Sequence, residues 1–389
     1  MRSSNLTRVL ADAHPEYRIG SLSQDNCRER AVRGRLRDIL PRNDSSFQIL
    51  LSGVSTEGRR LPLIRFGSGP IRLLLWSQMH GDESTATLTL MDMLSFLARG
   101  GHAKAGMASL AERCSLYMIP ILNPDGAEVQ TRHTAAGIDM NRDARRCVTP
   151  EARFLRNVHR IIHPSFGFNL HDQELSTVGN SSNLTAIALL APAAEERRRV
   201  SASRKRAMQV ASVMASSLKP LAEGRIGSYN DAFEPRAFGD MMQSWGTSTV
   251  LVESGHWVND PGKEKIRLLN FVGLLSAIES IASGSFRKAG LKAYSDLQEN
   301  GKRAYGVVVR GATVVHGPSF RIKADIGFQL ERLKGRVIAR IREVGDLRDF
   351  GAMLSIKGGK VIVNSSKVRI GDAVQINKLN KMLGTNLAW

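Results

Sequence analysis

Residues 71–83 read IRLLLWSQMHGDE, and they decide the fold because a short apolar run passes directly into a polar, charged loop. An apolar run of this length is typical of a strand buried on both faces of a mostly parallel sheet. Residues 85–101 follow, with apolar residues at roughly helical spacing and Gly100 and Gly101 closing the helix. The order strand, loop, helix predicts the start of an α/β domain.

The same order recurs through the first three quarters of the chain. Further buried strands are predicted at residues 115–122, 167–170 and 247–253. Helices are predicted at residues 151–162 and 195–220, and from the end of the last strand to about residue 281. Residues 47–67 alternate around a glycine-containing turn, which fits a hairpin of edge strands. Alternating strands and helices predict a sheet covered by helices.

From about residue 286 the sequence changes to short strands separated by Gly, Asp and Asn turns. These strands are predicted within residues 305–315, 321–328, 335–342, 351–363 and 367–376. We therefore expect two domains, an α/β domain at residues 1–285 and a smaller, β-rich C-terminal domain at residues 286–389.

The C-terminal domain is strongly basic. Residues 291–389 hold 18 Lys and Arg against 8 Asp and Glu, so this stretch carries +10 of the net charge of +19. A basic field attracts anionic partners without naming one. Because no recognition motif or base-stacking aromatic spacing accompanies it, a docking or solubilising role is favoured over nucleic-acid binding.

Composition excludes several classes of protein. The 389 residues are 42% hydrophobic and 23% charged, unlike disordered, collagen-like or coiled-coil chains. Three scattered cysteines suit neither a disulfide framework nor a Cys-x-x-Cys metal knuckle. The start lacks the apolar core of a secretory signal, and no apolar run is long enough to span a membrane. We expect a soluble, cytoplasmic protein without a membrane span; no oligomeric state follows from the sequence.

Three residues at the ends of apolar runs suggest a metal site. His80 and Glu83 form an H-x-x-E pair in the loop after residues 71–76, and His171 follows the strand at 167–170. Ligand sites of open α/β sheets lie at such strand ends. Two imidazoles and a carboxylate with one open position are typical of catalytic zinc. Each residue alone fits an ordinary loop or strand-end role, but together they predict one Zn²⁺ ion.

Glu253 ends the apolar strand at 247–253. An unpaired carboxylate is costly to bury in a core, so this position is more natural as part of a site.

The combination of motifs resembles the zinc carboxypeptidase family over about residues 45–285. The matching motifs and residues, in the family's order, are His80-x-x-Glu83, NPDG at 123–126, Arg132, GIDMNR at 137–142, His171 and Glu253. The resemblance implies a mixed, mostly parallel sheet packed between helices. It also implies that His80, Glu83 and His171 hold zinc.

The resemblance extends to the groups that handle the substrate. Asp139 is similar to the carboxylate that accepts the free N–H of His80 and fixes its tautomer. Asn141 and Arg142 resemble the pair that binds the terminal carboxylate of the substrate. Arg132 resembles the arginine that polarises the scissile carbonyl.

Glu253 matches the family's general base, which takes a proton from the attacking water and returns it to the leaving amine. Tyr229 is the nearest candidate for the tyrosine that covers the substrate, although its spacing is irregular. The residue before the zinc glutamate is Asp82, where digestive members have arginine, so contacts beyond the scissile bond are expected to differ.

We therefore expect a zinc carboxypeptidase that hydrolyses the C-terminal amide bond of a peptide or amino-acid conjugate. An amide hydrolase of the aspartoacylase or succinylglutamate desuccinylase type shares part of this pattern and is the nearest alternative. A peptidoglycan fragment or γ-glutamyl peptide is a further candidate substrate. A non-catalytic binding protein is disfavoured because no ligand or base is missing from the pattern.

Overall fold

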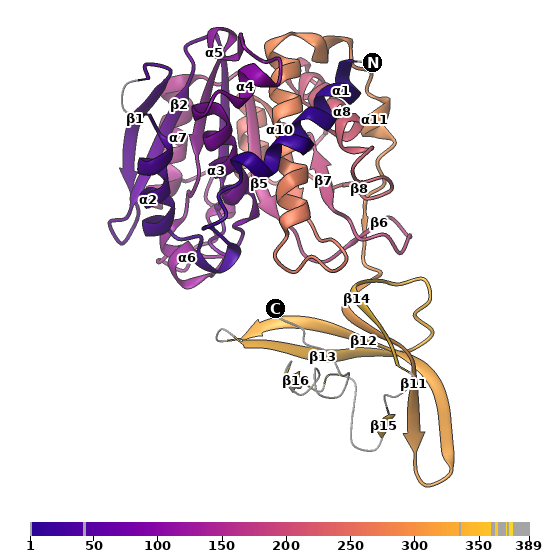
Figure 1. The fold of residues 1–389 in the computed structure, drawn as a ribbon. Coiled ribbons are helices and arrows are strands. Elements are labelled where there is room, and N and C mark those ends of the chain that lie inside the picture. Colours follow the sequence, from indigo (N-terminus) through magenta and orange to yellow (C-terminus); the bar gives the residue numbers. More distant parts are fainter. Residues whose placement is uncertain are drawn as a thin grey trace. The chain divides into compact units, whose positions relative to one another are not determined.

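The computed structural model describes residues 2–41, 44–333, 336–358, 362–364, 371 and 373–375, and the chain forms two compact units (Figure 1). Unit 1 comprises residues 1–173, 187–254 and 265–299. Unit 2 comprises residues 300–389 together with two short segments, 174–186 and 255–264.

Unit 1 is built on an eight-stranded mixed sheet of order β1-β2-β4-β3-β5-β9-β7-β8. The strands are β1 (Phe47–Val54), β2 (Arg60–Phe66), β3 (Ile71–Ser77), β4 (Cys114–Ile119), β5 (Phe166–Asp172), β7 (Ile187–Leu190), β8 (Ile226–Ser228) and β9 (Ser248–Ser254). Strands β4, β3, β5 and β9 run parallel, whereas β1, β2 and β7 make antiparallel pairings. Strands β3 and β4 are mostly apolar and are buried along most of their length, which agrees with the prediction of central strands covered on both faces.

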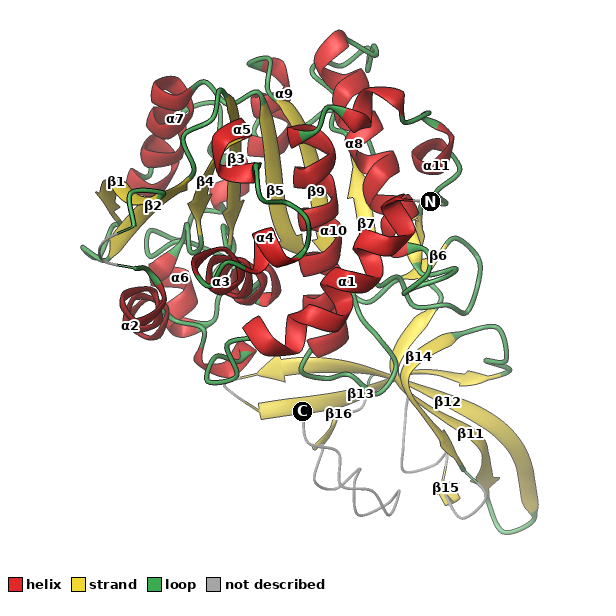
Figure 2. Ribbon diagram, turned by 45° about the horizontal axis from the view of Figure 1, so that its top comes forward, coloured by secondary structure: helices red, strands yellow, loops and turns green. Residues whose placement is uncertain are grey.

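Helices cover both faces of this sheet (Figure 2). On one face α3 (Thr85–Ala98) and α10 (Glu264–Ala282) pack together through Phe96 and Phe271, whose rings meet edge to face. On the other face α7 (Pro150–Ile162) and α9 (Phe238–Ser244) share a core with Leu74 and Trp76 of β3. The predicted sheet packed between helices is confirmed.

The remaining helices of unit 1 lie around these layers. They are α1 (Arg2–Tyr17), α2 (Glu29–Ile39), α4 (Gly101–Lys104), α5 (Leu110–Arg113), α6 (Pro124–Val129), α8 (Ala202–Leu218) and α11 (Lys292–Ser295). Three single turns of 3-10 helix occur at Gln24–Asn26, Met140–Arg142 and Ser285–Lys288. None of the helices among the described residues is long and apolar enough to cross a bilayer.

Two sequence predictions differ from the structure. Helix α8 begins at Ala202 and not at residue 195, because the Ser201 side chain caps it by accepting from the backbone N–H of Arg204. In the predicted hairpin only β1 is an edge strand, since β2 also pairs with β4. The N-terminal helices α1 and α2 were not predicted from the sequence.

A buried ion pair fixes α1 and α10 against α3. The Asp92 carboxylate accepts from Arg267 Nε at 2.6 Å and Nη2 at 2.5 Å, and His14 Nε2 lies 2.9 Å from it. All three side chains are almost fully buried. Removing one partner of such a pair leaves an uncompensated buried charge, so the three helices depend on one another.

Unit 2 contains a six-stranded sheet of order β14-β11-β12-β13-β16, with β15 pairing to β11. Its strands are β11 (Ala304–His316), β12 (Phe320–Leu333), β13 (Arg336–Gly345), β14 (Gly351–Lys357), β15 (Ile362–Asn364) and β16 (Ala373–Gln375). A second, two-stranded sheet joins β6 (Thr177–Val178) to β10 (Asn300–Gly301). The predicted β-rich character is confirmed; of the strand predicted at 367–376, residues 367–370, 372 and 376 lie outside the described part of the chain.

Candidate metal centre

The three predicted metal ligands meet at the carboxyl ends of neighbouring strands. His80 and Glu83 lie in the loop between β3 and α3, and His171 lies near the end of β5, which pairs in parallel with β3. In the next strand, Glu253 of β9 is directly opposite His171 in the register. Residues 91 positions apart in sequence therefore converge because parallel strands end at the same edge of a sheet.

The donor atoms of the three ligands lie within contact distance of one another. His80 Nδ1 is 2.6 Å from Glu83 Oε1, and His171 Nδ1 is 2.8 Å from Glu83 Oε2. The two Nδ1 atoms are 3.2 Å apart. All three side chains are buried. This is the one cluster of its kind that could hold a metal ion among the described residues.

This geometry suits a zinc ion. Bonds of about 2.0–2.1 Å to imidazole nitrogens in a tetrahedral site separate two nitrogens by about 3.3 Å, close to the observed 3.2 Å. Two ring nitrogens that face each other at this distance can both ligate one cation. The donor set of two imidazoles and one carboxylate is also the set preferred by catalytic zinc.

Opposed effects set the charge of the metal-free cluster. Burial alone would lower the pKa of His80, but hydrogen bonds to Asp139 and Glu83 outweigh it and raise the pKa to about 9. Burial alone would raise the pKa of Glu83, but the adjacent His171 and His80 hold it well below its ordinary value. Burial lowers the pKa of His171. A metal ion that binds here must therefore displace the proton of His80.

Asp139 holds the outer side of the His80 ring. Its Oδ1 accepts from His80 Nε2 at 3.1 Å, which directs the other ring nitrogen, Nδ1, toward the cluster. Its Oδ2 accepts from Arg132 Nε at 3.0 Å, and Arg132 Nη1 is 3.3 Å from Glu83 Oε1. Burial would raise the pKa of Asp139, but the bonds from His80 and Arg132 lower it below its usual range. Asp139 and Arg132 thus lie beside the cluster, in contact with His80 and Glu83.

Asn141 and Arg142 continue the same loop. Asn141 donates its backbone N–H to Asp139 Oδ1 at 2.9 Å, and its side-chain oxygen accepts from the N–H of Phe238 at 2.9 Å. The Arg142 side chain is 41% exposed, and its Nε lies 3.8 Å from a carboxylate oxygen of Glu234. Arg142 therefore keeps a solvent-accessible guanidinium on the loop that supports His80.

Glu253 is buried next to the cluster. Burial, together with the nearby carboxylates of Glu83 and Asp172, raises the pKa of Glu253 to about 8.

Tyr229 follows β8, and its backbone N–H donates to the carbonyl of Leu189. Its side chain is 41% exposed, and its role as a substrate cover stays a prediction.

Two glycines allow the loops of the site to touch. A Cβ atom at Gly81 would lie 2.0 Å from the carbonyl carbon of Gly126, so the loop with His80 and the NPDG turn meet backbone to backbone. The NPDG sequence itself begins α6, where the Asn123 side chain accepts from the N–H of Gly126 and Pro124 occupies the first turn. Asp125 accepts from Ser55 Oγ at 2.7 Å, which joins the turn to the β1–β2 hairpin.

The sequence model of the zinc carboxypeptidase family matches residues 36–186, which contain all three candidate ligands, Asp139 and Arg132. This stretch, about two fifths of the chain, is similar to the zinc carboxypeptidases. Glu253 lies outside the matched stretch, so its place beside the cluster comes from the register of β5 and β9.

Individual zinc carboxypeptidases are distant in sequence. Carboxypeptidase 2 of Trichophyton rubrum is 24% identical over 128 residues, which cover 30% of this chain and 23% of that protein. The probable carboxypeptidase 2 of Arthroderma benhamiae gives the same identity, with 24% of its length covered. The chain thus spans about a quarter of the length of the curated relatives it matches.

Solved structures share the fold. A metallo-carboxypeptidase from Burkholderia cenocepacia superposes with a TM-score of 0.51 at 19% identity, covering 65% of this chain and 68% of that one. Bovine thrombin-activatable fibrinolysis inhibitor, in complex with tick carboxypeptidase inhibitor, has a TM-score of 0.52 at 14% identity, covering 66% of this chain and 97% of that one.

Asp172 supports the metal centre through two hydrogen bonds, and no role was predicted for it from the sequence. The N–H of Asp172 donates to Glu83 Oε2 at 3.1 Å, and the Asp172 carboxylate accepts from Thr85 Oγ1 at 2.5 Å. These bonds tie the end of β5 to the first turn of α3 and hold Glu83 between them. The signal available in the sequence is the position of Asp172 directly after His171.

Proposed function

We propose that the protein is a zinc-dependent carboxypeptidase that hydrolyses the C-terminal amide bond of a peptide. The observation that supports this most is the meeting of His80, Glu83 and His171 within 2.6–3.2 Å, with Glu253 opposite His171 in the adjacent strand. The proposal assigns one zinc ion to the centre, held by these three residues.

When bound, zinc supplies a Lewis acid that polarises a carbonyl and acidifies a water molecule. The chain supplies the groups that move protons. Glu253 takes a proton from the attacking water and passes it to the nitrogen of the leaving amine as the amide bond breaks. Burial beside Glu83 and Asp172 raises the pKa of Glu253 to about 8 in the metal-free site, which makes its carboxylate a stronger base than an exposed one.

Arg132 stabilises the charge that develops on the substrate oxygen. Its guanidinium is held by Asp139 at 3.0 Å, and its side chain is 40% exposed, so part of it is open to a ligand. An oriented donor that is already in place costs little reorganisation when charge develops on the oxygen. Arg132 is thus a catalytic residue in this proposal, and Asp139 is a positioning residue for both Arg132 and His80.

Arg142 and Asn141 bind the free carboxylate at the end of the substrate. The planar guanidinium of Arg142 matches a carboxylate in two parallel hydrogen bonds. Glu234, 3.8 Å from Arg142 Nε, is a weak partner at that distance, so a substrate carboxylate can replace it. This requirement for a free C-terminus distinguishes an exopeptidase from an endopeptidase.

The test uses the full-length protein stripped of metal with a chelator and then reloaded with zinc. The substrates are matched peptides with a free or an amidated C-terminus, together with N-acylated amino acids, and mass spectrometry identifies the products. We expect zinc-dependent release of the last residue from the free-acid peptides alone.

Cleavage of N-acyl amino acids without action on peptides would overturn the proposal in favour of an amide hydrolase of the aspartoacylase type. Equal cleavage of amidated and free-acid peptides would overturn the role of Arg142. Restored zinc content without any hydrolysis of these substrates would overturn the assigned reaction.

A further inference from the structure

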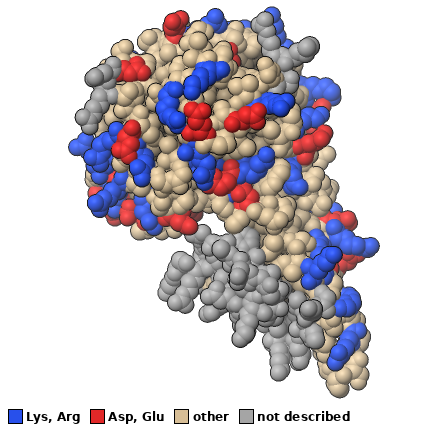
Figure 3. Space-filling view, in the orientation of Figure 1, with Lys and Arg blue, Asp and Glu red and all other residues tan. Residues whose placement is uncertain are grey.

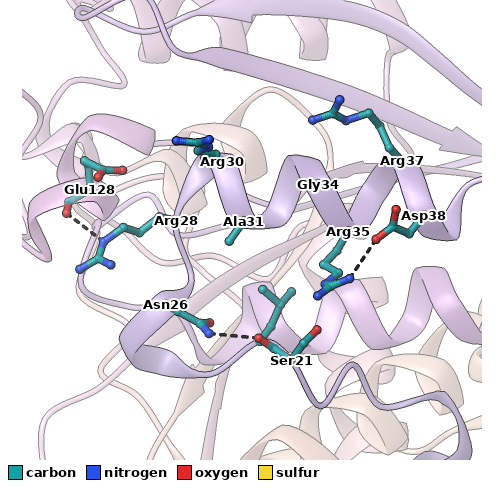
Figure 4. A pocket seen from close by; sticks show the side chains of 11 residues that line it. Ser21, Asn26, Arg28, Arg30, Ala31, Gly34, Arg35, Arg37, Asp38 and Glu128 are labelled. Carbon is teal, nitrogen blue, oxygen red and sulfur yellow. Dashed lines mark hydrogen bonds and ion pairs between the residues drawn. The ribbon is translucent and has the colours of Figure 1, made fainter.

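A groove of about 820 Å³ lies along α2 (Figure 4). Its volume is within the range of about 300–1,000 Å³ that is usual for ligand sites. The lining residues are Ser21, Leu22, Asn26, Arg28, Arg30, Ala31, Gly34, Arg35, Arg37, Asp38 and Glu128. None of them belongs to the metal centre or to the groups assigned to substrate in the proposed reaction.

The groove has an edge of unpaired arginines. Arg30 and Arg37 are exposed, and neither side chain has an ion-pair or hydrogen-bond partner in the part of the chain that the structure describes. Seven positions apart on one helix, they lie two turns apart along the same edge, about 10 Å from one another. Figure 3 shows Lys and Arg side chains gathering on the flank of unit 1 where Figure 1 draws α2.

At the opposite edge of the groove, an ion pair and a hydrogen bond hold the lining side chains in place. Figure 4 shows Arg35 beside the loop with Ser21 and Asn26, across α2 from Arg30 and Arg37. Arg35 Nη1 is 3.0 Å from Asp38 Oδ2. The Asn26 side chain donates to the Ser21 carbonyl at 3.0 Å, which fixes that loop.

At one end of the groove a fourth arginine is held in place. Arg28 Nε donates to the carbonyl of Glu128 in α6 at 3.1 Å, which fixes this side chain in the lining. Four arginines against two carboxylates give the lining a net positive charge.

Gly34 keeps the middle of the groove open. Glycine in a helix interior is destabilising relative to alanine. No atom lies within 4 Å of the position that a Cβ of residue 34 would take, so close packing does not require glycine here. The missing side chain instead leaves the floor between Ala31 and Arg35 low enough for a ligand to lie along the helix.

The lining favours an acidic peptide over a nucleic acid. No aromatic residue lines the groove, so bases would have nothing to stack on. The carboxylates of Asp38 and Glu128 would repel a closely spaced row of phosphates. An extended peptide carries its charges farther apart, and its backbone can pair with the hydroxyl and amide groups of Ser21 and Asn26. In an extended polyproline II conformation, with three residues per turn and about 3.1 Å per residue, acidic side chains three positions apart lie on one side of the peptide and match the separation of Arg30 and Arg37.

We propose that the groove along α2 binds an acidic peptide segment in extended conformation, with two carboxylates paired to Arg30 and Arg37. The proposal is independent of hydrolysis, because binding at α2 uses none of the residues assigned to the metal centre. Such a site would recruit acidic protein segments to unit 1.

Fluorescence anisotropy of a labelled, amidated peptide with glutamates three positions apart tests the site on the full-length protein. We expect saturable binding that weakens with added salt, because exposed charge pairs are screened. The double variant Arg30→Glu/Arg37→Glu should weaken binding about tenfold or more, since two attractive contacts become repulsive.

The matched control is Arg8→Glu/Arg33→Glu. It makes the same change in net charge on α1 and α2, but Arg8 and Arg33 pair with Asp12 and Glu29 and do not line the groove. We expect this control to change the affinity by less than about twofold.

A second pair of variants tests the shape of the groove without changing charge. Gly34→Trp fills the floor and should weaken binding about as much as the double reversal, whereas Gly34→Ala should bind and fold at least as well as the native chain. Circular dichroism checks that each variant is folded.

Three outcomes would overturn the proposal. The first is an equal loss of affinity in the Arg8 and Arg33 control, which would mean unspecific attraction to a basic protein. The second is unchanged binding in Gly34→Trp. The third is tighter, Arg30-dependent binding of a single-stranded oligonucleotide of the same charge, which would assign the groove to nucleic acid.

Discussion

Replacing Asp139 with asparagine separates the charge of this side chain from its shape. The carboxylate accepts three hydrogen bonds, at Oδ1 from His80 Nε2 and the N–H of Asn141, and at Oδ2 from Arg132 Nε. The asparagine oxygen can keep the first two. Its NH₂ group would then face the N–H of Arg132, so a charge-assisted bond becomes a contact between two donors.

The expected loss of zinc affinity follows from these contacts. Hydrogen bonds to charged groups contribute about 1.5–3 kcal/mol, and substitutions of groups that orient a metal ligand typically lower metal affinity about 10–100-fold. For Asp139→Asn we expect a loss within that range, or about 1.4–2.7 kcal/mol. The accompanying release of Arg132 should lower kcat for peptide hydrolysis further than the loss of zinc explains.

Competition with a chromophoric zinc chelator measures this loss. Because metal-free His80 has a pKa of about 9, the titration is best run at or above that pH, where the proton no longer competes with zinc. Asp143→Asn is the matched control. Asp143 lies in the same loop and accepts from the N–H groups of Val148 and Thr149, without contact to His80.

Zinc affinity within twofold of the native value in folded Asp139→Asn would refute this reasoning. An equal loss of zinc affinity in Asp143→Asn would show that the affinity depends on the general order of the loop and not on the bond between Asp139 and His80.

Three further predictions test separate parts of the structure. Glu253→Gln should bind zinc normally and lose about 10²–10⁴-fold in kcat, measured by product release at matched zinc content; full turnover would remove Glu253 from the proton-transfer role. Apparent zinc affinity should fall as the pH drops below the His80 pKa of about 9, by at most about tenfold per pH unit, and binding should release about one proton in weakly buffered solution. Arg267→Met should lower the free energy of unfolding by about 3–5 kcal/mol in urea titrations, because it leaves Asp92 buried without its cation, and Arg267→Met/Asp92→Leu should recover part of that loss.

The sequence predicted the central strands and the metal cluster because both are encoded locally. IRLLLW, GFNL and TSTVLVE have the mostly apolar character of doubly buried strands, and His80, His171 and Glu253 stand after or at their ends. Since parallel strands end at one edge of a sheet, residues far apart in sequence are expected to meet there.

Other features could not be predicted because tertiary contacts decide them. Helix α2 is rich in charged residues, and α1 is fixed by a buried partner, Asp92, in α3. The interior position of β2 depends on its pairing with β4, about fifty residues later in the chain. The start of α8 depends on the cap at Ser201, where the basic run alone suggested an earlier start.

The position of His171 on an interior strand, with His80 held from outside by Asp139, has a practical consequence. His171 is held in β5 between two hydrogen-bonded neighbours, and His80 is oriented by Asp139, so protein contacts and not the ion set the arrangement. Small zinc-binding domains unfold without their metal. Here the scaffold should persist intact after the ion is stripped, which permits exchange for cobalt or another spectroscopically visible substitute and direct observation of ligand geometry in solution.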